Sequence, residues 1–478
     1  MNVIESLLKE VEAFFRGIPD DEGGLLLAVS GGVDSTVMAD VIHRLFPEKR
    51  VGIAHVNFHL RGEDSNRDQE FVRNLAQRYG FEFYTTDFDT STHASEHGVS
   101  IEIAARELRY RWFCSLAAEE GFKLLCTAHN ANDNAETLLL NLVRGTGRQG
   151  LGGIRPKGLV NGSDLMVIRP LLNIERSEIE EYARESNLSW CTDRTNSQNE
   201  YSRNKVRNQV IPLLEQINPS VIRSLCRDIS RFQDLNSEVD KLVGGKVDSL
   251  LLKNGPDSGN IIDLLRKKYL VFRSSVERIS QTGNVRFYLA ELLRRFSVPL
   301  NEDELDRISD GLDSDNPSTR VYFLKEGTAT IERGELRLYS SLGEVPSAFE
   351  IEGCGQYVFG SMKISVSLAD ASSAGPGAVR FSEDGNCVSV MDASDLDFPL
   401  VCRTLKEGDS FSPFGLKGSK KVADFLNSRK ADLLFKNIVP VVTKKDGRIV
   451  CLPSLEIDNR YKVTSQSKKL LMISVSSS

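Results

Sequence analysis

The sequence of 478 residues lacks the segments that would place a protein in a membrane or outside the cell. No apolar run approaches the roughly 20 residues that cross a bilayer. The N-terminal stretch "MNVIESLLKEVEAFF" is acidic and amphipathic, without the basic region and apolar core of a secretory signal. Internal repeats and low-complexity tracts are missing as well. These absences predict a cytoplasmic protein.

Cysteine pairs of the redox or metal-binding type are also missing. The eight cysteines are scattered and form no CxxC pair and no Cys/His zinc spacing. Buried, reduced thiols are the simplest interpretation. A catalytic pair is the alternative, and Cys114, Cys126 and Cys191 are its only candidates in the first two hundred residues.

An excess of positive charge is absent from the chain as a whole, whose formal net charge is −7. This balance argues against a general nucleic-acid binder. Residues 411–470 differ, because they carry thirteen Lys or Arg and five Asp or Glu, a local net charge of +8. Any contact with RNA should therefore be confined to patches.

The first two hundred residues alternate between strand and helix patterns. The strand-like runs are "GLLLAVS", "RVGIAHVNF", "FEFYTTDF" and "KLLCTAH", and helical patterns cover 33–45, 64–79, 99–120 and 133–143. Short apolar strands between longer helices predict an α/β fold, a doubly wound parallel sheet covered on both faces. Because ligands of such sheets bind beyond the carboxyl ends of the strands, the turns "AVSGG" and "TAHNAND" should line one crevice.

The remainder of the chain has a different texture. Residues 216–312 look all-helical, and 319–341 carry Glu-Gly and Arg-Gly turns typical of a short hairpin. The stretch 343–400 predicts small β elements. From 401 the patterns indicate a compact α+β module, with helix "KKVADFLNSRK", strand "IVPVVTKKDGRIVCLP" and a last strand "KLLMISVS".

The stretch "AVSGGVDS" has the form of a phosphate-binding turn. Two glycines after a strand let the backbone present N–H groups to an anion, and the next helix adds its positive end. Ser30 and Ser35 supply hydroxyl donors, while Asp34 could cap the helix, hold Mg²⁺ or position a nucleotide. The lysine of a GxxxxGK[ST] loop, which neutralises the β and γ phosphates during γ-phosphoryl transfer, is missing. Its absence indicates that the terminal phosphoryl group is not what moves; a turn that only links strand to helix is the alternative.

The pattern SGGxDS resembles that of the ATP pyrophosphatases with a PP-loop. The resemblance implies that ATP is bound by Ser30, Gly31, Gly32, Val33, Asp34 and Ser35. It also implies that the β and γ phosphates leave as one unit, while an acceptor attacks the α phosphorus and becomes adenylated.

Further motifs follow in a fixed order and identify one branch of these enzymes. They are "HVNFHLRGEDSNRDQEFV", "IEIAARELRYRWF", "CTAHNANDNAETLLLNLVRGTGRQGLGGI", "IRPLL", "DRTNSQNEYSRNKVRNQVIPLL" and "GDSFSPFGLKGSKKVADFLNSRK". The set closely resembles the bacterial tRNA(Ile)-lysidine synthetase family, strongly over about 1–215 and clearly over about 401–465. The middle is similar only in its helical texture.

This resemblance implies a two-step reaction that uses ATP and Mg²⁺. The C2 oxygen of the wobble cytidine of an isoleucine tRNA with a CAU anticodon attacks the α phosphorus, and diphosphate leaves. The ε-amine of free L-lysine then displaces AMP to give lysidine. The family also suggests a homodimer.

Candidate catalytic residues lie on two helices. Glu102, Arg106 and Arg109 share one helix face, either as a surface ion-pair row or, for Arg109 by resemblance, as the arginine that stabilises negative charge at the reacting centre. Asp133 and Glu136, at i and i+3 near His129, could hold a lysine amine or Mg²⁺, although the helix dipole alone favours acidic residues there.

Two questions about this acidic region stay open from the sequence. Either Asp133 or Glu136 could accept the proton that an attacking lysine must lose. Asn132 stands where many family members have Asp, which puts a metal role at that position in doubt. His55, His59 and His129 are candidates for orienting groups, or are simply hydrogen-bonded beside a sheet.

Candidate tRNA contacts occur in three basic stretches. Arg144 and Arg148 belong to a glycine-rich turn that could approach RNA or be a flexible loop. Arg203 and Arg207 flank Lys205 at i and i+4, as phosphate clamps or a solvated basic face. The C-terminal module resembles the part of the family that grips the tRNA body, with the basic residues Lys417, Lys420, Lys421, Arg429 and Lys430.

We therefore expect four parts. These are a PP-loop ATP-binding catalytic domain (1–215), a mainly helical substrate-binding domain with a terminal hairpin (216–342), a small β-rich connecting region (343–400) and a basic α+β tRNA-binding domain (401–478). A tRNA thiolase of the same superfamily, an amidating synthetase for a small molecule and an RNA-binding scaffold with a degenerate loop are the alternatives.

Overall fold

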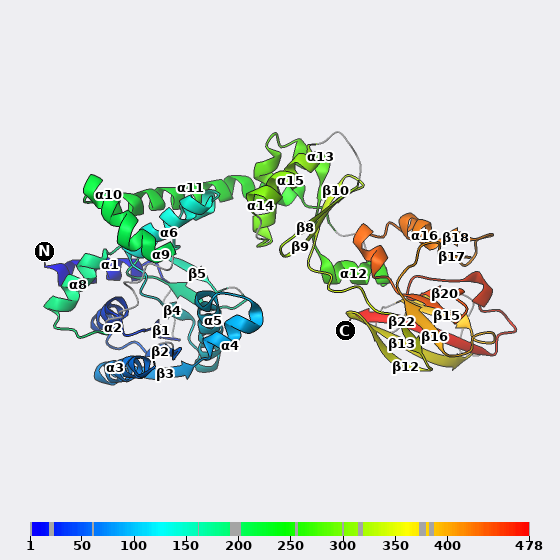
Figure 1. The fold of residues 1–478 in the computed structure, drawn as a ribbon, viewed down its shortest axis with the longest axis horizontal. Helices are drawn as coiled ribbons and strands as arrows, with labels where there is room; N and C mark the ends of the chain where they lie inside the picture. Colours follow the sequence, from blue (N-terminus) through cyan, green and yellow to red (C-terminus); the bar gives the residue numbers. More distant parts are fainter. Residues whose placement is uncertain are drawn as a thin grey trace. The chain divides into compact units, whose positions relative to one another are not determined.

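The structure of the chain is a computed structural model. It describes residues 2–18, 23–59, 62–160, 162–191, 202–253, 257–298, 301–313, 319–371, 379–381 and 387–477. Contacts divide the chain into two compact units, Met1–Lys241 and Leu242–Ser478, here called the N-terminal and C-terminal units (Figure 1). The four-part division stays a prediction.

The N-terminal unit is built on a six-stranded sheet with the order β3-β2-β1-β4-β6-β5. Its strands are β1 (Leu25–Ala28), β2 (Val51–Asn57), β3 (Glu82–Asp87), β4 (Leu124–Cys126), β5 (Lys157–Leu159) and β6 (Met166–Ile168). All neighbours are parallel except β5 and β6. The strand order reverses direction at β1, between β2 and β4, which is where doubly wound sheets bind ligands.

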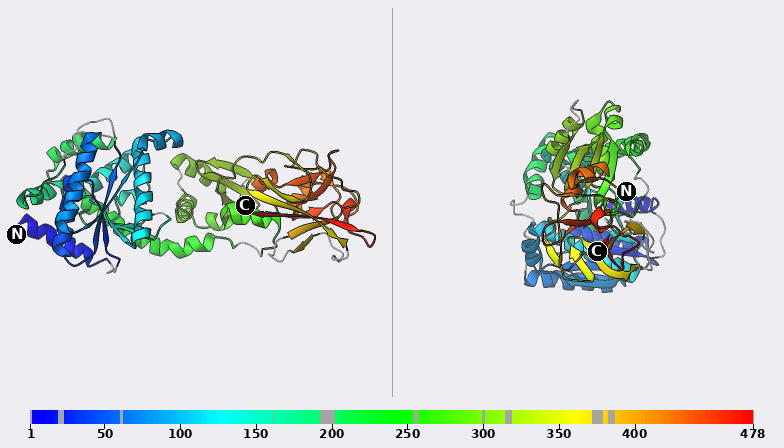
Figure 2. Two further views of the ribbon diagram at one scale, coloured as in Figure 1. Left: turned by 90° about the horizontal axis from the view of Figure 1, so that it is seen from below. Right: turned by 90° about the vertical axis from the view of Figure 1, so that its right-hand side faces the viewer.

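Helices cover both faces of this sheet, as the alternating side chains of β1 require (Figure 2). Leu25 and Leu27 point into a core with α1 (Val3–Phe15), α2 (Val33–Leu45), α3 (Glu63–Tyr79) and α8 (Arg176–Glu185). Leu26, between them, points into a second core with α5 (Ile101–Glu120). The predicted doubly wound α/β fold is confirmed.

The N-terminal unit contains several further helices. They are α4 (Thr90–His97), α6 (Ala131–Arg144), α7 (Arg148–Leu151), α9 (Ser202–Lys205), the π-helical turn η2 (Val206–Val210) and α10 (Ile211–Ile217). Helix α11 (Val221–Leu250) follows. The segment 192–201, which includes most of the motif "DRTNSQNEYS", lies outside the described residues.

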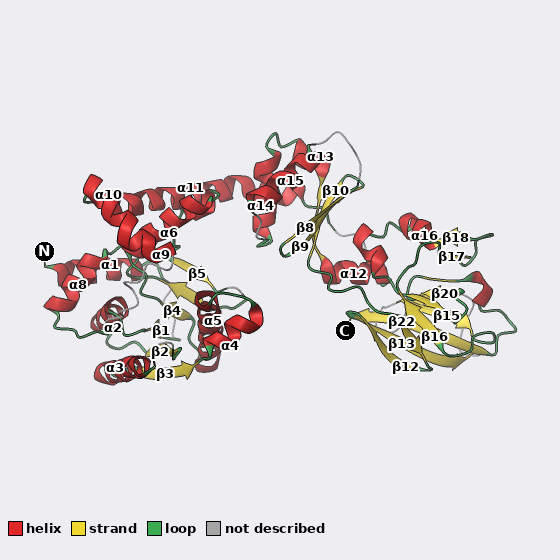
Figure 3. Cartoon of the chain, in the orientation of Figure 1, coloured by secondary structure: helices red, strands yellow, loops and turns green. Residues whose placement is uncertain are grey.

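The C-terminal unit combines helices with antiparallel sheets (Figure 3). Its helices are α12 (Ile261–Tyr269), α13 (Val276–Ser280), α14 (Val285–Arg295), α15 (Glu302–Leu312) and α16 (Val422–Ser428), with 3-10 turns at Leu433–Asn437 and Asn459–Tyr461. A four-stranded sheet has the order β7-β10-β9-β8, from β7 (Leu270–Ser275), β8 (Arg320–Leu324), β9 (Gly327–Glu332) and β10 (Glu335–Tyr339). Where one hairpin was predicted, over 319–341, the chain forms two consecutive hairpins, β8–β9 and β9–β10.

Two predictions for this unit were wrong in detail. Residues 216–312 are not all helical, because Leu270–Ser275 forms strand β7, whose partner β10 lies about 65 residues away along the sequence. The stretch 438–453 is not one strand but two, β19 (Val441–Thr443) and β20 (Ile449–Leu452). Gly447, at φ +87°, closes the turn between them.

Strands from 343–400 and from the C-terminal tail are mixed in two five-stranded sheets. One sheet has the order β11-β16-β19-β20-β21, with β11 (Phe349–Ile351), β16 (Leu400–Arg403) and β21 (Glu456–Ile457). The other has the order β12-β13-β22-β15-β14, with β12 (Gly355–Phe359), β13 (Met362–Asp370), β14 (Val379–Phe381), β15 (Cys387–Asp392) and β22 (Lys469–Ser477). A short pair, β17 (Ser410–Phe411) and β18 (Lys420–Lys421), completes the unit. Both larger sheets contribute to one core.

The hydropathy and length of the helices show whether any of them could cross a membrane. Across the described ranges, none of them is both long enough and apolar enough to cross a bilayer.

Candidate active site

The turn after β1 has the geometry that its sequence predicts. Gly31 adopts φ +92°, where an L side chain is strained, and Gly32 caps the N-terminus of α2. The Ser30 and Ser35 hydroxyl oxygens lie 3.3 Å apart, and the Ser35 hydroxyl donates to the Gly32 carbonyl at 3.0 Å. Val33 is buried, so that only its backbone can face a ligand. The turn thus presents two hydroxyls and the positive end of α2 to one side.

A cavity of about 680 Å³ opens at this turn and extends past the carboxyl ends of β1, β2 and β4. Eight of the residues singled out from the sequence as ATP-binding, catalytic or tRNA-binding line it: Ser30, Gly32, Asp34, Ser35, Arg109, His129, Asp133 and Arg203. His55 lines it as well. Gly31, Val33, Glu136 and Arg207 do not belong to its lining. The expected convergence of "AVSGG" and "TAHNAND" on one crevice is therefore observed.

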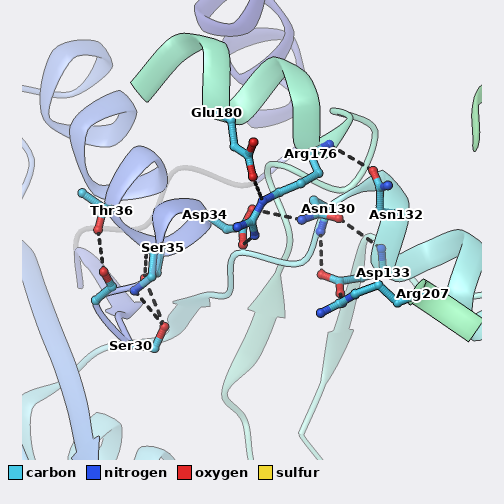
Figure 4. Close-up of polar contacts among 12 residues, drawn as sticks. Ser30, Asp34, Ser35, Thr36, Asn130, Asn132, Asp133, Arg176, Glu180 and Arg207 are labelled. Atoms are coloured by element: carbon cyan, nitrogen blue, oxygen red, sulfur yellow. Dashed lines mark hydrogen bonds and ion pairs between the residues drawn. The ribbon is translucent and has the colours of Figure 1, made fainter. Parts of the chain in front are cut away.

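Helix α6 begins with a reciprocal cap that fixes Asp133. The Asn130 side chain accepts from the Asp133 backbone N–H at 3.0 Å, and the Asp133 carboxylate accepts from the Asn130 N–H at 3.1 Å. The Asn130 amide also donates to Asp34 Oδ1 at 3.0 Å. One asparagine therefore connects the phosphate-binding turn to the start of α6 (Figure 4).

Two arginines already neutralise the acidic pair. Arg203 and Arg207 donate to Glu136 at 2.8 and 2.6 Å, and both also contact Asp133 Oδ1, at 3.2 and 3.1 Å. Glu136 is fully buried, whereas Asp133 borders the cavity. Arg207 lies in the π-helical turn η2, a deviation from α geometry that often occurs at functional sites.

His129 is a neutral imidazole at physiological pH. Burial lowers its pKa to about 4; the nearby Asp133 carboxylate opposes the shift, and the surrounding guanidinium groups of Arg169, Arg203 and Arg106 add to it. Its Nδ1 lies 3.0 Å from the Thr127 hydroxyl. Burial is thus the main reason that His129 stays neutral.

The other histidine candidates differ from each other. His55 is buried, its Nδ1 lies 2.9 Å from the Val29 carbonyl, and burial lowers its pKa. His59 is exposed and its Nε2 lies 2.9 Å from Asp87 Oδ1. Of these two, only His55 reaches the cavity.

The three residues predicted to share one face of α5 differ in burial. Glu102 and Arg106 are exposed, and the Arg106 guanidinium lies 5.0 Å from the centre of the Tyr110 ring. Arg109 is half-buried on the cavity wall, and burial lowers its pKa. A partly desolvated guanidinium has the strongest effect on negative charge that develops beside it.

Candidate tRNA contacts are not all equally accessible. Arg144 is exposed at the end of α6, whereas Arg148 donates to Asp240 at 2.5 Å and to Asn236 at 3.0 Å, which ties α7 to α11. In the C-terminal unit, Lys417 and Lys421 are exposed. Lys420 donates to Ser428 and Arg429 donates to Glu456, each at 3.0 Å.

A metal site at Asp34 does not fit the donors around it. Both carboxylate oxygens are engaged, Oδ1 by Asn130 and Oδ2 by the guanidinium of Arg176. In the parts of the chain that the structure describes, no group of three or more His, Cys, Asp or Glu side chains could hold a metal ion. Asn132, in turn, accepts a hydrogen bond at 3.0 Å from the Arg176 backbone N–H at the start of α8.

Sequence reasoning missed two residues of this site, Asn130 and Arg176. Asn130 could have been found as a helix cap, because Asp133 follows three residues later. Nothing local signals Arg176, which reaches Asp34 across 142 residues of sequence.

Of the three candidate cysteines, Cys126 is poorly suited to sulfur transfer. Cys126 belongs to β4 and is fully buried, and burial raises its pKa strongly. Cys114 and Cys191 are half-buried and belong to no disulfide. A buried thiol with a raised pKa is a poor nucleophile, which disfavours the thiolase alternative.

Comparisons with known proteins identify the family of the chain. A family profile described as a PP-loop domain matches residues 4–214. The chain is 32% identical to tRNA(Ile)-lysidine synthase of Bacteroides thetaiotaomicron over 98% of this chain and 99% of that protein. It is 30% identical to the synthase of Parabacteroides distasonis over 94% of each.

Solved structures of low identity also resemble parts of the chain. One is the U34-tRNA thiolase NcsA of Methanococcus maripaludis, with 18% identity, a TM-score of 0.40, and coverage of 48% of this chain and 80% of that one. Another is the C-terminal domain of TILS, with 19% identity, a TM-score of 0.23, and coverage of 27% and 98%. The near-full-length match to the first relative makes this chain a member of the tRNA(Ile)-lysidine synthase family, and thus a ligase with a PP-loop ATP-binding domain.

Proposed function

We propose that the enzyme joins free L-lysine to C2 of the wobble cytidine (position 34 of the tRNA) of an isoleucine tRNA with a CAU anticodon. ATP is consumed, an adenylated cytidine is the intermediate, and AMP and diphosphate are released. The observation that carries the proposal is a single cavity that joins the phosphate-binding turn to Arg109, His129 and Asp133. Its volume, about 680 Å³, lies in the usual range of ligand pockets.

In the first step the C2 oxygen of the cytidine bonds to the α phosphorus, and the bond to the bridging oxygen of diphosphate breaks. The turn from Ser30 to Ser35 holds the departing phosphates through backbone N–H groups and hydroxyls. Arg109 compensates the negative charge that develops at the α phosphorus. Mg²⁺ would be bound by the phosphates, since the Asp34 carboxylate is already neutralised by the Arg176 guanidinium, whose charge repels a cation.

In the second step the lysine ε-amine bonds to C2, AMP leaves with the C2 oxygen, and the amine loses a proton. Asp133 is our choice for the residue that contacts the amine and accepts this proton, because its carboxylate borders the cavity. Glu136 is buried behind it and holds Arg203 and Arg207, so we assign it a positioning role. The amine would share or displace the two guanidinium groups at Asp133.

The tRNA contacts that we propose are Arg144, Arg203 and Arg207 near the cavity and Lys417, Lys420, Lys421 and Arg429 in the C-terminal unit. Arg148 is bonded to α11 and is the weakest candidate of the set. Contacts of this kind position the RNA rather than read its sequence. The wobble base must also leave its stack to enter the cavity.

The test is a reaction of the protein with ATP, Mg²⁺, radiolabelled lysine and bulk tRNA. We expect label in tRNA only when ATP is present, with AMP and diphosphate formed in step with it. Products of ADP and orthophosphate, or tRNA that stays unlabelled although the protein binds it, would contradict the proposal.

The thiolase alternative has its own test. A variant with Cys114, Cys126 and Cys191 all replaced by Ala should retain most of the lysine incorporation. If that variant folds normally but is inactive, sulfur chemistry regains support.

A further inference from the structure

The phosphate-binding turn lacks a lysine, yet a fixed positive charge reaches it from another element. Arg176, the first residue of α8, donates through Nη1 to Asp34 Oδ2 in the first turn of α2. Figure 4 shows the Arg176 side chain extending from α8 toward Asp34. Asp34 is about three-quarters buried, with 23% of its side chain exposed.

The position of Arg176 is fixed by two further contacts of its own and by the packing of α8. Its Nε donates to Glu180 at 2.8 Å, one helical turn later, and its backbone N–H donates to Asn132 at 3.0 Å. Helix α8 packs on α2 through Ile179 and Tyr182, which are fully buried, and the Tyr182 hydroxyl donates to Asp40 of α2 at 2.7 Å. Arg176 therefore meets Asp34 from a rigid support.

The segment after α8 also contacts the phosphate-binding turn, at Gly31. The Cys191 backbone N–H, a few residues beyond α8, donates to the Gly31 carbonyl at 2.9 Å. A Cβ on Gly31 would lie 3.4 Å from Cys191 Sγ, so the two segments are in close contact. Residues of α8 and the segment after it thus touch the turn at both its glycine and its acidic residue.

The charge of the Asp34–Arg176 ion pair affects ATP binding. A bare carboxylate in the first turn of α2 would repel the β and γ phosphates that this turn is shaped to bind. A guanidinium paired with that carboxylate cancels the repulsion while Asp34 stays hydrogen-bonded to Asn130.

We propose that Arg176 is a positioning residue for ATP: it is the permanent counter-charge of Asp34 and holds the first turn of α2 ready for the phosphates. Asp34 is accordingly not a magnesium ligand. The inference rests on ATP binding by the PP-loop domain and not on the identity of the final product.

The test is a double-mutant cycle on ATP binding by the full chain, without tRNA or lysine. It compares the unmodified protein with Arg176→Gln, Asp34→Asn and the double variant. We expect Arg176→Gln to weaken ATP binding about tenfold in the parent and less than about twofold in the Asp34→Asn background, since no carboxylate is left to neutralise. Equal losses in both backgrounds would overturn the proposal.

Two controls separate this role from a merely structural one. Arg184→Gln, a matched change on the exposed side of α8, should leave ATP binding unchanged, and Arg176→Lys, which keeps the charge, should recover most of it. If Arg176→Gln does not fold, Arg176→Lys and the double variant replace it. Arg176→Lys should bind ATP nearly as well as the parent, and the double variant should bind it within about twofold of Asp34→Asn. A larger loss in either variant would count against the proposal.

Magnesium gives an independent readout. The Mg²⁺ concentration that half-saturates ATP binding should be the same in Arg176→Gln as in the parent. A fall in that concentration would mean that Arg176 had competed with the metal for Asp34, and would overturn the second part of the proposal. Because product formation is not measured, these outcomes stand whether or not lysidine is made.

Discussion

At the scale of single residues, the two acidic residues of α6 differ in their access to the cavity. Asp133 and Glu136 are one helical turn apart, yet only Asp133 lines the cavity, while Glu136 is fully buried under Arg203 and Arg207. Two carboxylates with such different surroundings should respond differently to substitution.

Replacement of Asp133 by Asn tests this difference. We expect lysine incorporation to fall about 100-fold or more, the usual contribution of a proton acceptor, while formation of the adenylated tRNA continues. Single-turnover release of diphosphate without lysine measures the first step, and label incorporation measures the second. Full lysine incorporation by the variant would remove Asp133 from the proposed role.

The lowered pKa of His129 predicts a dependence of stability on pH. The folded protein binds this proton near pH 4, whereas the unfolded chain binds it near the ordinary value of about 6.5. As pH falls through this window, the unfolded state gains the proton first, so stability is lost toward low pH.

The expected size of this effect is about 2 kcal/mol between pH 7 and pH 5. Urea unfolding at both values should show that His129→Gln loses less stability than the parent by about this amount. An identical loss in both proteins would show that His129 does not carry a lowered pKa.

At the scale of elements, the sequence patterns predicted four strands of the N-terminal sheet, β1 to β4, and the helices between them, because these signals are local; the short strands β5 and β6 were not predicted. The helix predicted at 33–45 is α2 with the same bounds, and those predicted at 64–79, 99–120 and 133–143 correspond to α3, α5 and α6 within two residues at either end. The convergence of two strand-end turns follows from parallel pairing, so it could be inferred without coordinates.

The features that the sequence did not reveal depend on distant partners. Strand β7 exists because β10 supplies its hydrogen bonds, and a short run of six residues has little periodicity of its own. The same holds for the site, since the ion pairs of Arg203 and Arg207 with Asp133 and Glu136 were not expected from the sequence. Side-chain partners 70 residues away leave no local pattern.

The segment from α9 through η2 to α10 should depend on these ion pairs for its attachment to α6. Arg207→Ala leaves the buried Glu136 with one guanidinium instead of two, and we expect a cost of about 2 kcal/mol in the free energy of unfolding. Arg144→Ala, an exposed arginine on α6, should cost less than about 0.5 kcal/mol. Chemical denaturation compares the two; equal effects would mean that the buried pairing contributes little.

At the scale of the whole molecule, the excess of positive charge in this acidic protein lies in residues 411–470 of the C-terminal unit. Lys417 and Lys421 are exposed there, whereas Lys420 and Arg429 are bonded to neighbouring side chains. The two exposed lysines are therefore the better candidates for phosphate contacts.

Salt dependence of tRNA binding measures such contacts directly. The double variant Lys417→Gln/Lys421→Gln should bind tRNA more weakly and reduce the slope of log affinity against log salt by about 1 to 2. A matched variant, Lys9→Gln in α1, should leave the slope unchanged. Unchanged slopes in both variants would exclude the two lysines from the RNA interface.

The order of strands in the C-terminal unit also constrains how the protein is made. Strand β22 lies between β13 and β15, although it is translated about 80 residues after β15. That sheet cannot close until Ser477 has left the ribosome, whereas every strand of the N-terminal sheet has emerged soon after residue 168. During synthesis, β13 and β15 are made before β22, the strand that pairs with both. The nascent chain therefore exposes unpaired strand edges that a chaperone could recognise.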